Sequence, residues 1–75
     1  MSEINERMLR DRKVKTYFSE AKLRDQLAAL LGADEQRVPY VIMPIGIRFT
    51  AVVFLPAEYT WRAHAIAAAG FYITN

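Results

Sequence analysis

The sequence predicts an α+β fold in which a small antiparallel sheet carries two helices on one face. Apolar residues recur at helical spacing over residues 19–31. Two runs rich in β-branched and aromatic residues, 38–43 and 47–55, flank a turn signal, and an alanine-rich segment follows them. The chain has 75 residues, of which 53% are hydrophobic, so residues 1–75 are expected to form a single domain with one core.

The first helix is expected over residues 19–31. Its core-facing positions are leucines at helical spacing: Leu23, Leu27, Leu30 and Leu31. Ser19 stands where a side chain can cap the first turn, and Gly32 follows the last turn, where a positive φ ends a helix. Phe18 and Leu23 have the spacing of a hydrophobic staple, which predicts that they pack together.

A β-hairpin is expected next, with strands over residues 38–43 and 47–55. Residues 44–46 contain Pro44 and Gly46, which suit a turn because proline presets φ and glycine accepts a positive φ. Pro39 cannot donate a ladder hydrogen bond, so the first of these strands is predicted to lie at the edge of the sheet.

The second helix is expected over residues 57–69. Pro56 suits a helix start, Gly70 suits a helix end, and Glu58 and Arg62 have the spacing of an ion pair along one helix face. Residues 71–74 then read as a short terminal strand.

The first 18 residues leave two folds open. Residues 2–18 can form one charged helix, or residues 1–12 can form a basic arm or short helix before a strand over 13–18. Val14, Thr16 and Phe18 alternate with polar or less apolar neighbours, which favours the strand. The favoured order is then βαββαβ, the ferredoxin-like arrangement, and the alternative is ααββαβ with a three-stranded sheet.

The residue inventory argues against catalysis and against a metal site. The chain has no cysteine and one histidine, His64, which has no Asp, Glu or Ser three or four residues further along its helix. Its three glycines are too scattered for a phosphate-binding loop, and Asp34 and Glu35 read as solvated turn residues. We therefore expect no enzyme activity, no catalytic residues, no metal and no cofactor.

No membrane association is expected either. The longest apolar run, residues 38–57, is interrupted by Arg48, so it does not suit a membrane span. Residues 1–15 are charged throughout and do not resemble a secretory signal, so a cytoplasmic location is expected.

One face of the second hairpin strand is expected to look outward. This face carries Arg48, Thr50, Val52 and Phe54, and its expected neighbours on other segments are Lys15, Tyr17, Tyr40, Ile42 and Tyr72. Basic and aromatic side chains interleaved in this way resemble the surface with which RNA-recognition-type domains stack bases. The glycine that follows the basic residue in their consensus is absent after Arg48, so no family residue is carried over. An interface with a second copy or with another protein explains the same face equally well.

The leading expectation for function is a small interaction protein that binds a larger protein partner and occludes or adapts it. Inhibitors and adaptors that phages or mobile elements encode are comparable in size. The expected partner-binding residues are Tyr17, Tyr40, Arg48, Phe54 and Trp61. A homodimer is also expected, because so short and apolar a chain gains from burying surplus apolar surface.

The alternative is a nucleic-acid-binding protein. Basic residues are concentrated near the start of the chain, and the expected phosphate-binding residues are Arg7, Arg10, Arg12, Lys13 and Lys15.

Overall fold

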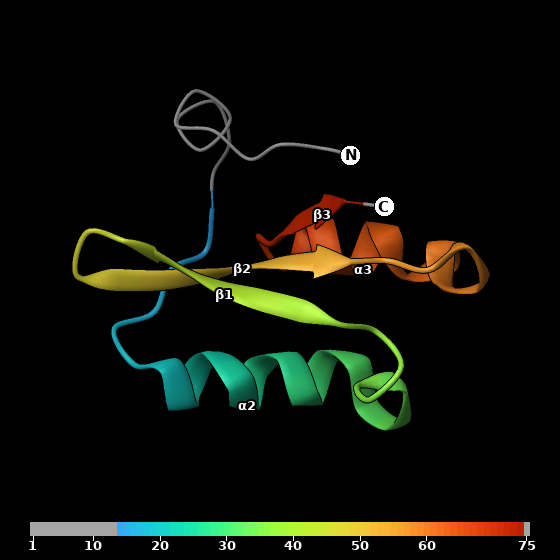
Figure 1. Ribbon diagram of the computed structural model, residues 1–75, viewed down its shortest axis with the longest axis horizontal. Helices are drawn as coiled ribbons and strands as arrows, with labels where there is room; N and C mark the ends of the chain where they lie inside the picture. The colour runs from blue at the N-terminus through green and yellow to red at the C-terminus, as the bar shows by residue number, and fades with distance from the viewer. Residues whose placement is uncertain (1–13, 75) are drawn as a thin grey trace.

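The structure is a computed structural model and describes residues 14–74. Helix α2 (Glu20–Leu31) leads through a 3₁₀ turn, η1 (Gly32–Asp34), into strands β1 (Tyr40–Ile45) and β2 (Arg48–Phe54). A 3₁₀ helix, η2 (Ala57–Arg62), continues into helix α3 (Ala63–Ala68), and strand β3 (Tyr72–Thr74) follows (Figure 1). None of the described helices is long and apolar enough to cross a bilayer.

The sheet is three-stranded and mixed, in the order β1-β2-β3. Strands β1 and β2 are antiparallel, whereas β2 and β3 are parallel, so the prediction of an antiparallel sheet is wrong for β3. In the ferredoxin-like order, the N-terminal strand lies between the two strands that the second helix joins. Here β3 pairs directly with β2, and a helical crossover of this kind returns the chain parallel to its starting strand.

The N-terminal segment contributes one β-bridge instead of the strand expected over residues 13–18. Tyr17 pairs with Phe49 in antiparallel orientation, and their backbone N–H···O bonds measure 2.8 and 2.7 Å. Residues 14–18 are not helical, and position 13 and the arm or helix expected over residues 1–12 lie outside the described residues. Within residues 14–74, this bridge is therefore all that forms of the first strand in the predicted βαββαβ order.

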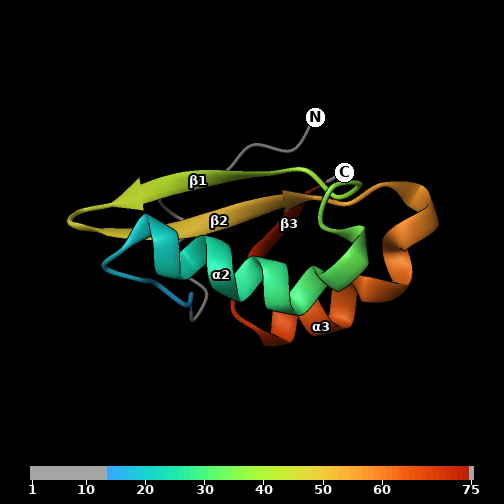
Figure 2. The ribbon, with the colours of Figure 1, turned by 90° about the horizontal axis from the view of Figure 1, so that it is seen from below.

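The core lies between the sheet and the two helices. Both helices cover the same face of the sheet, as predicted, and lie side by side on it (Figure 2). Ala51, Val53 and Leu55 point into this core, which confirms the predicted core-facing side of β2. The other fully packed members come from both helices and from the segments before β1 and β3: Leu23, Leu27, Leu31, Val38, Ile66 and Phe71.

Helix α2 confirms the prediction at both ends to within one residue. The Ser19 hydroxyl accepts a hydrogen bond from the Lys22 N–H at 3.4 Å, and Gly32 takes a φ of 56° directly after the helix. Phe18 does not behave as a staple residue, because it remains 65% exposed while Leu23 is fully buried.

The hairpin turn lies further along the chain than predicted. Gly46 and Ile47 form a two-residue turn between β1 and β2, and Gly46 has a φ of 61°. A positive φ at the first central residue is the pattern of a type II′ hairpin turn. Pro44 belongs to β1, opposite Phe49, and it is tolerated there because β1 is an edge strand, as predicted.

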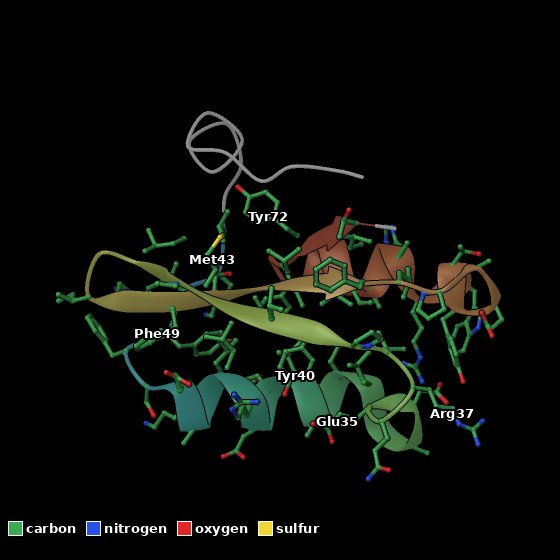
Figure 3. The ribbon with its side chains drawn as sticks, in the orientation of Figure 1. Glu35, Arg37, Tyr40, Met43, Phe49 and Tyr72 are labelled. Carbon is green, nitrogen blue, oxygen red and sulfur yellow. The ribbon has the colours of Figure 1, made fainter. Side chains whose placement is uncertain are left out.

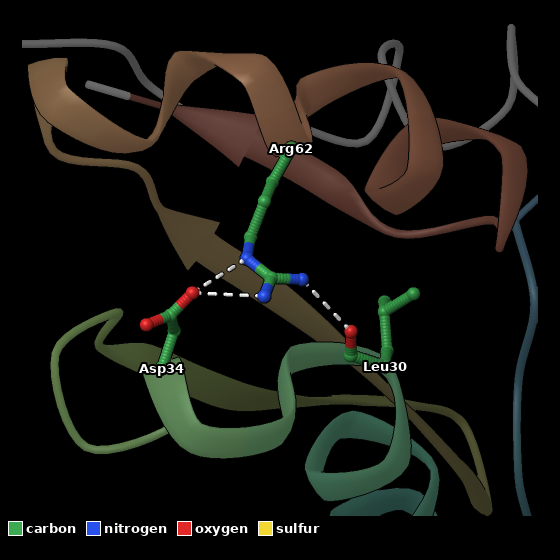
Figure 4. Close-up of polar contacts among 3 residues, drawn as sticks. All are labelled: Leu30, Asp34 and Arg62. Carbon is green, nitrogen blue, oxygen red and sulfur yellow. Dashed lines mark hydrogen bonds and ion pairs between the residues drawn. The ribbon is translucent and has the colours of Figure 1, made fainter.

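The predicted helix over residues 57–69 is divided into η2 and α3. Arg62 stands at the junction and bonds to the C-terminal end of α2 instead of pairing with Glu58. Its Nε and Nη2 donate to Asp34 Oδ2 at 3.0 and 2.8 Å, and its Nη1 donates to the Leu30 carbonyl at 3.1 Å (Figure 4). The Leu30 carbonyl is one of the last four of α2, which have no partner within the helix.

Candidate functional site

Two of the five expected partner-binding residues, Tyr17 and Tyr40, pack at the margin of the core. The Tyr17 ring stacks on Phe71, with ring centroids 6.3 Å apart and planes 20° from parallel. The Tyr40 ring lies on the α2 side of the sheet, with Arg24 Cζ 6.0 Å from its centroid (Figure 3). Both tyrosines are partly buried against the core cluster, so they stabilise the fold.

The expected basic and aromatic face of the sheet does not form. Pairing of Tyr40 with Val53, of Ile42 with Ala51 and of Tyr17 with Phe49 places those three residues on the core side. Tyr72 does lie beside Val52 on the outer side, as expected, but both of these residues are buried. Figure 3 shows Tyr40 and Phe49 on one side of the sheet and Met43 and Tyr72 on the other.

Two exposed apolar residues and a half-buried arginine lie at the turn end of the hairpin, and we call them the hairpin-end patch: Phe18, Ile47 and Arg48. Ile47 is 81% exposed and Phe18 is 65% exposed. Arg48 Cζ lies 4.0 Å from the centroid of the Phe18 ring, which is a cation–π contact. Arg48 Nη2 also donates to the Thr16 carbonyl at 3.0 Å, so the guanidinium is fixed from two sides.

Local structure explains why Phe18 meets Arg48 next to the hairpin turn. Phe18 lies between Tyr17, which the bridge to Phe49 holds beside β2, and the helix cap Ser19. Ile47 is the second residue of the hairpin turn, and Arg48 is the first residue of β2. The bridge therefore brings Phe18, which precedes the helix cap, to the turn end of the hairpin.

Phe54 and Trp61 lie away from this patch. Phe54 ends β2, six residues after Arg48, which corresponds to about 20 Å of extended strand. It borders a shallow apolar hollow of about 370 Å³, lined by Pro39, Phe54, Leu55, Pro56 and Ala57. Trp61 is 67% exposed on η2, which lies at the opposite end of the molecule from the hairpin turn in Figure 1. The five expected partner-binding residues thus do not form one surface.

Lys15 is the one expected phosphate-binding residue that the structure describes, since Arg7, Arg10, Arg12 and Lys13 lie outside residues 14–74. Its side chain is exposed, with Nζ 5.8 Å from the centroid of the Tyr17 ring. It borders a groove of about 510 Å³ between α2 and α3, whose other lining residues are Tyr17, Gln26, Ala29, Leu30, Ala68, Ala69 and Phe71.

No group of three or more His, Cys, Asp or Glu side chains gathers within residues 14–74. His64 is exposed on α3, and Asp34 is committed to Arg62 instead of being a solvated turn residue. Hydrogen bonding with Tyr59 raises the pKa of Arg37 above its ordinary value, and Asp34 adds to this shift, so Arg37 stays cationic.

Comparisons with protein-family models, with curated proteins and with solved structures give no match to this chain. The hairpin-end patch is the candidate functional site of the described residues. Of its three residues, the sequence predicts Arg48 as a partner-binding residue, Phe18 as part of a hydrophobic staple and Ile47 as the first residue of the strand over 47–55. A two-residue turn starting at Gly46 is the sequence signal that places Ile47 outside the strand.

Proposed function

We propose that this protein is a small non-enzymatic binding protein that attaches to a larger protein and occludes or adapts it. Inhibitors and adaptors that phages or mobile elements encode act in this way. The observation that carries the proposal is the hairpin-end patch, in which Arg48 stacks on an exposed Phe18 beside an exposed Ile47.

The composition and the rigidity of this patch both suit a protein interface. Aromatic residues and arginine supply a large share of the binding energy at interfaces. Ordering a long side chain on binding costs entropy, and the bond from Arg48 to the Thr16 carbonyl has already fixed this side chain. Phe18 and Ile47 also leave apolar surface exposed at this end of the hairpin, which favours association with another surface.

The proposal is tested by capturing partners from cells that produce the protein, with and without nuclease. Phe18→Ala and Ile47→Ser should each weaken binding of a nuclease-resistant protein partner at least tenfold. Both side chains are mainly exposed, so both variants should keep the wild-type circular dichroism spectrum. Trp61→Ser is the matched control, because it removes an equally exposed apolar side chain elsewhere and should leave binding unchanged.

Two outcomes would overturn the proposal. In the first, the patch variants keep every partner at full affinity. In the second, nuclease removes all bound material, and purified protein binds DNA or RNA with log K falling by about 0.9 per phosphate contact against log salt. Loss of this binding on changing Arg10, Arg12, Lys13 and Lys15 to alanine would establish the nucleic-acid alternative.

A further inference from the structure

The edge of β1 that faces away from β2 has a defined set of backbone donors and acceptors. The Phe54 N–H donates to the Pro39 carbonyl at 2.9 Å, so Pro39 and every second residue after it direct their backbone groups toward β2. The residues between them, Tyr40, Ile42 and Pro44, direct theirs away from β2. Within residues 14–74 no strand pairs with that side of β1.

This edge is only two donors long. Pro44 has no N–H, and the Val38 N–H is already bonded to the Asp34 carbonyl at 3.1 Å. Tyr40 and Ile42 are therefore the two residues of the edge that offer both an N–H and a carbonyl. An exposed edge of this kind is a template for pairing with another strand.

We infer that this edge pairs with the same edge of a second copy of the chain, antiparallel about a two-fold axis at Val41. In this register Tyr40 lies opposite Ile42 of the second copy, and each such pair exchanges two N–H···O bonds. The two-fold axis generates the second pair, Ile42 with Tyr40 of the second copy. The two pairs make four hydrogen bonds, which use the N–H and the carbonyl of Tyr40 and of Ile42 in each copy. Pro44 lies beyond the paired segment, so its missing donor costs nothing.

Val41 supports a second copy as the occupant. It is 50% exposed and points to the outer side of the sheet, between Tyr40 and Ile42 in the chain. On the axis, the two Val41 residues form a non-hydrogen-bonded pair, in which Cα atoms lie about 4.5 Å apart and side chains touch. Self-pairing thus buries the exposed apolar side chain at the centre of the edge.

The charges beside this edge are also self-complementary. Arg24 on α2 lies over Tyr40, and Glu20 lies one turn away with its carboxylate 3.9 Å from the guanidinium. Both side chains are more than half exposed. A two-fold axis reverses the direction of α2 in the second copy, so each Glu20–Arg24 pair meets the same two charges in reverse order. Opposite charges then face each other, which favours pairing.

Sedimentation equilibrium over a range of concentrations tests the inference. The wild-type chain should dimerise, and Val41→Glu should raise the dissociation constant at least tenfold, because it places two carboxylates on the axis. A synthetic chain with an N-methyl group on Ile42 should be monomeric, since the methyl group replaces the outward N–H and leaves the ladder with β2 intact. Ile47→Ser is the control and should dimerise like the wild type.

Amide hydrogen exchange of the wild-type chain locates the interface. Protection of the Tyr40 and Ile42 amides should rise with protein concentration, whereas the Val41 amide, bonded to β2, should be protected at all concentrations. A monomer at hundreds of micromolar overturns the inference. So does a dimer that survives N-methylation of Ile42, or one that Ile47→Ser dissociates, because the interface would then lie elsewhere.

Discussion

Gly70 packs directly against the backbone of the N-terminal segment at Lys15. Its carbonyl accepts a hydrogen bond from the Lys15 N–H at 3.0 Å. A Cβ at position 70 would lie 2.6 Å from Lys15 Cβ and 2.8 Å from Lys15 N, well inside van der Waals contact. The φ of 93° at Gly70 is also one that other residues rarely adopt. Two separate constraints therefore require glycine here.

Gly70→Ala should destabilise the protein more than Gly46→Ala does. Gly46 also has a positive φ, but nothing lies within 4 Å of its added Cβ, so only backbone strain on the order of 1–3 kcal/mol is expected there. Gly70→Ala adds the contact with Lys15 to a strain of similar size. Urea unfolding followed by circular dichroism measures both losses. Equal losses would show that the segment around Lys15 moves aside without cost.

Among the helices and strands, the sequence predicted best those features that depend on residues close together in the chain. The bounds of α2 followed from leucine spacing, a capping serine and a terminal glycine, all of which act within one or two turns. The position of Pro44 was predicted wrongly, because a proline suits a turn and the open side of an edge strand equally well. The orientation of β3 depends on which strand lies next to β2, and no local pattern encodes that choice.

The candidate site likewise contains one residue that the sequence could predict and one that it could not. Arg48 was predicted as a binding residue from its residue type and from its place on the outward face of the strand expected over residues 47–55. Phe18 joins it only through the bridge between Tyr17 and Phe49, a contact between segments far apart in the chain. Spacing along the sequence therefore could not reveal the hairpin-end patch as a unit.

The link from Arg62 to Asp34 should hold η2 against the end of α2. The two side chains are 19% and 24% exposed, so water screens their ion pair only partly. Arg62→Lys should cost about 1–2 kcal/mol of unfolding free energy, because a single ammonium group cannot reproduce the bonds to both Asp34 and the Leu30 carbonyl. A double-mutant cycle with Asp34→Asn, measured by urea unfolding, should give a coupling energy above 0.5 kcal/mol. Additive losses would mean that the pair contributes no stability of its own.

Contacts between residues far apart in the sequence hold the N-terminal segment to β2 and to Gly70. Thr50 Oγ1 donates to the Lys15 carbonyl across 35 positions of sequence, and Arg48 bonds to the Thr16 carbonyl across 32. By contrast, α2 and the β1–β2 hairpin form from residues close together in the chain. Loop closure costs more entropy as the loop lengthens, so the local elements should form before the N-terminal segment docks.

We therefore expect this docking to be a late step in folding and an early step in unfolding. Thr50→Val removes the hydroxyl donor but keeps the shape of the side chain, and it leaves the Lys15 carbonyl without this partner. In stopped-flow experiments it should therefore speed unfolding several-fold and change the refolding rate less than twofold. Ala29→Gly, at an exposed position of α2, should instead slow refolding, because it weakens an element that forms early. If Thr50→Val instead slows refolding as strongly as Ala29→Gly does, the N-terminal segment docks before the transition state. If Thr50→Val only speeds unfolding, the contacts of residues 15–17 set the rate at which the protein unfolds.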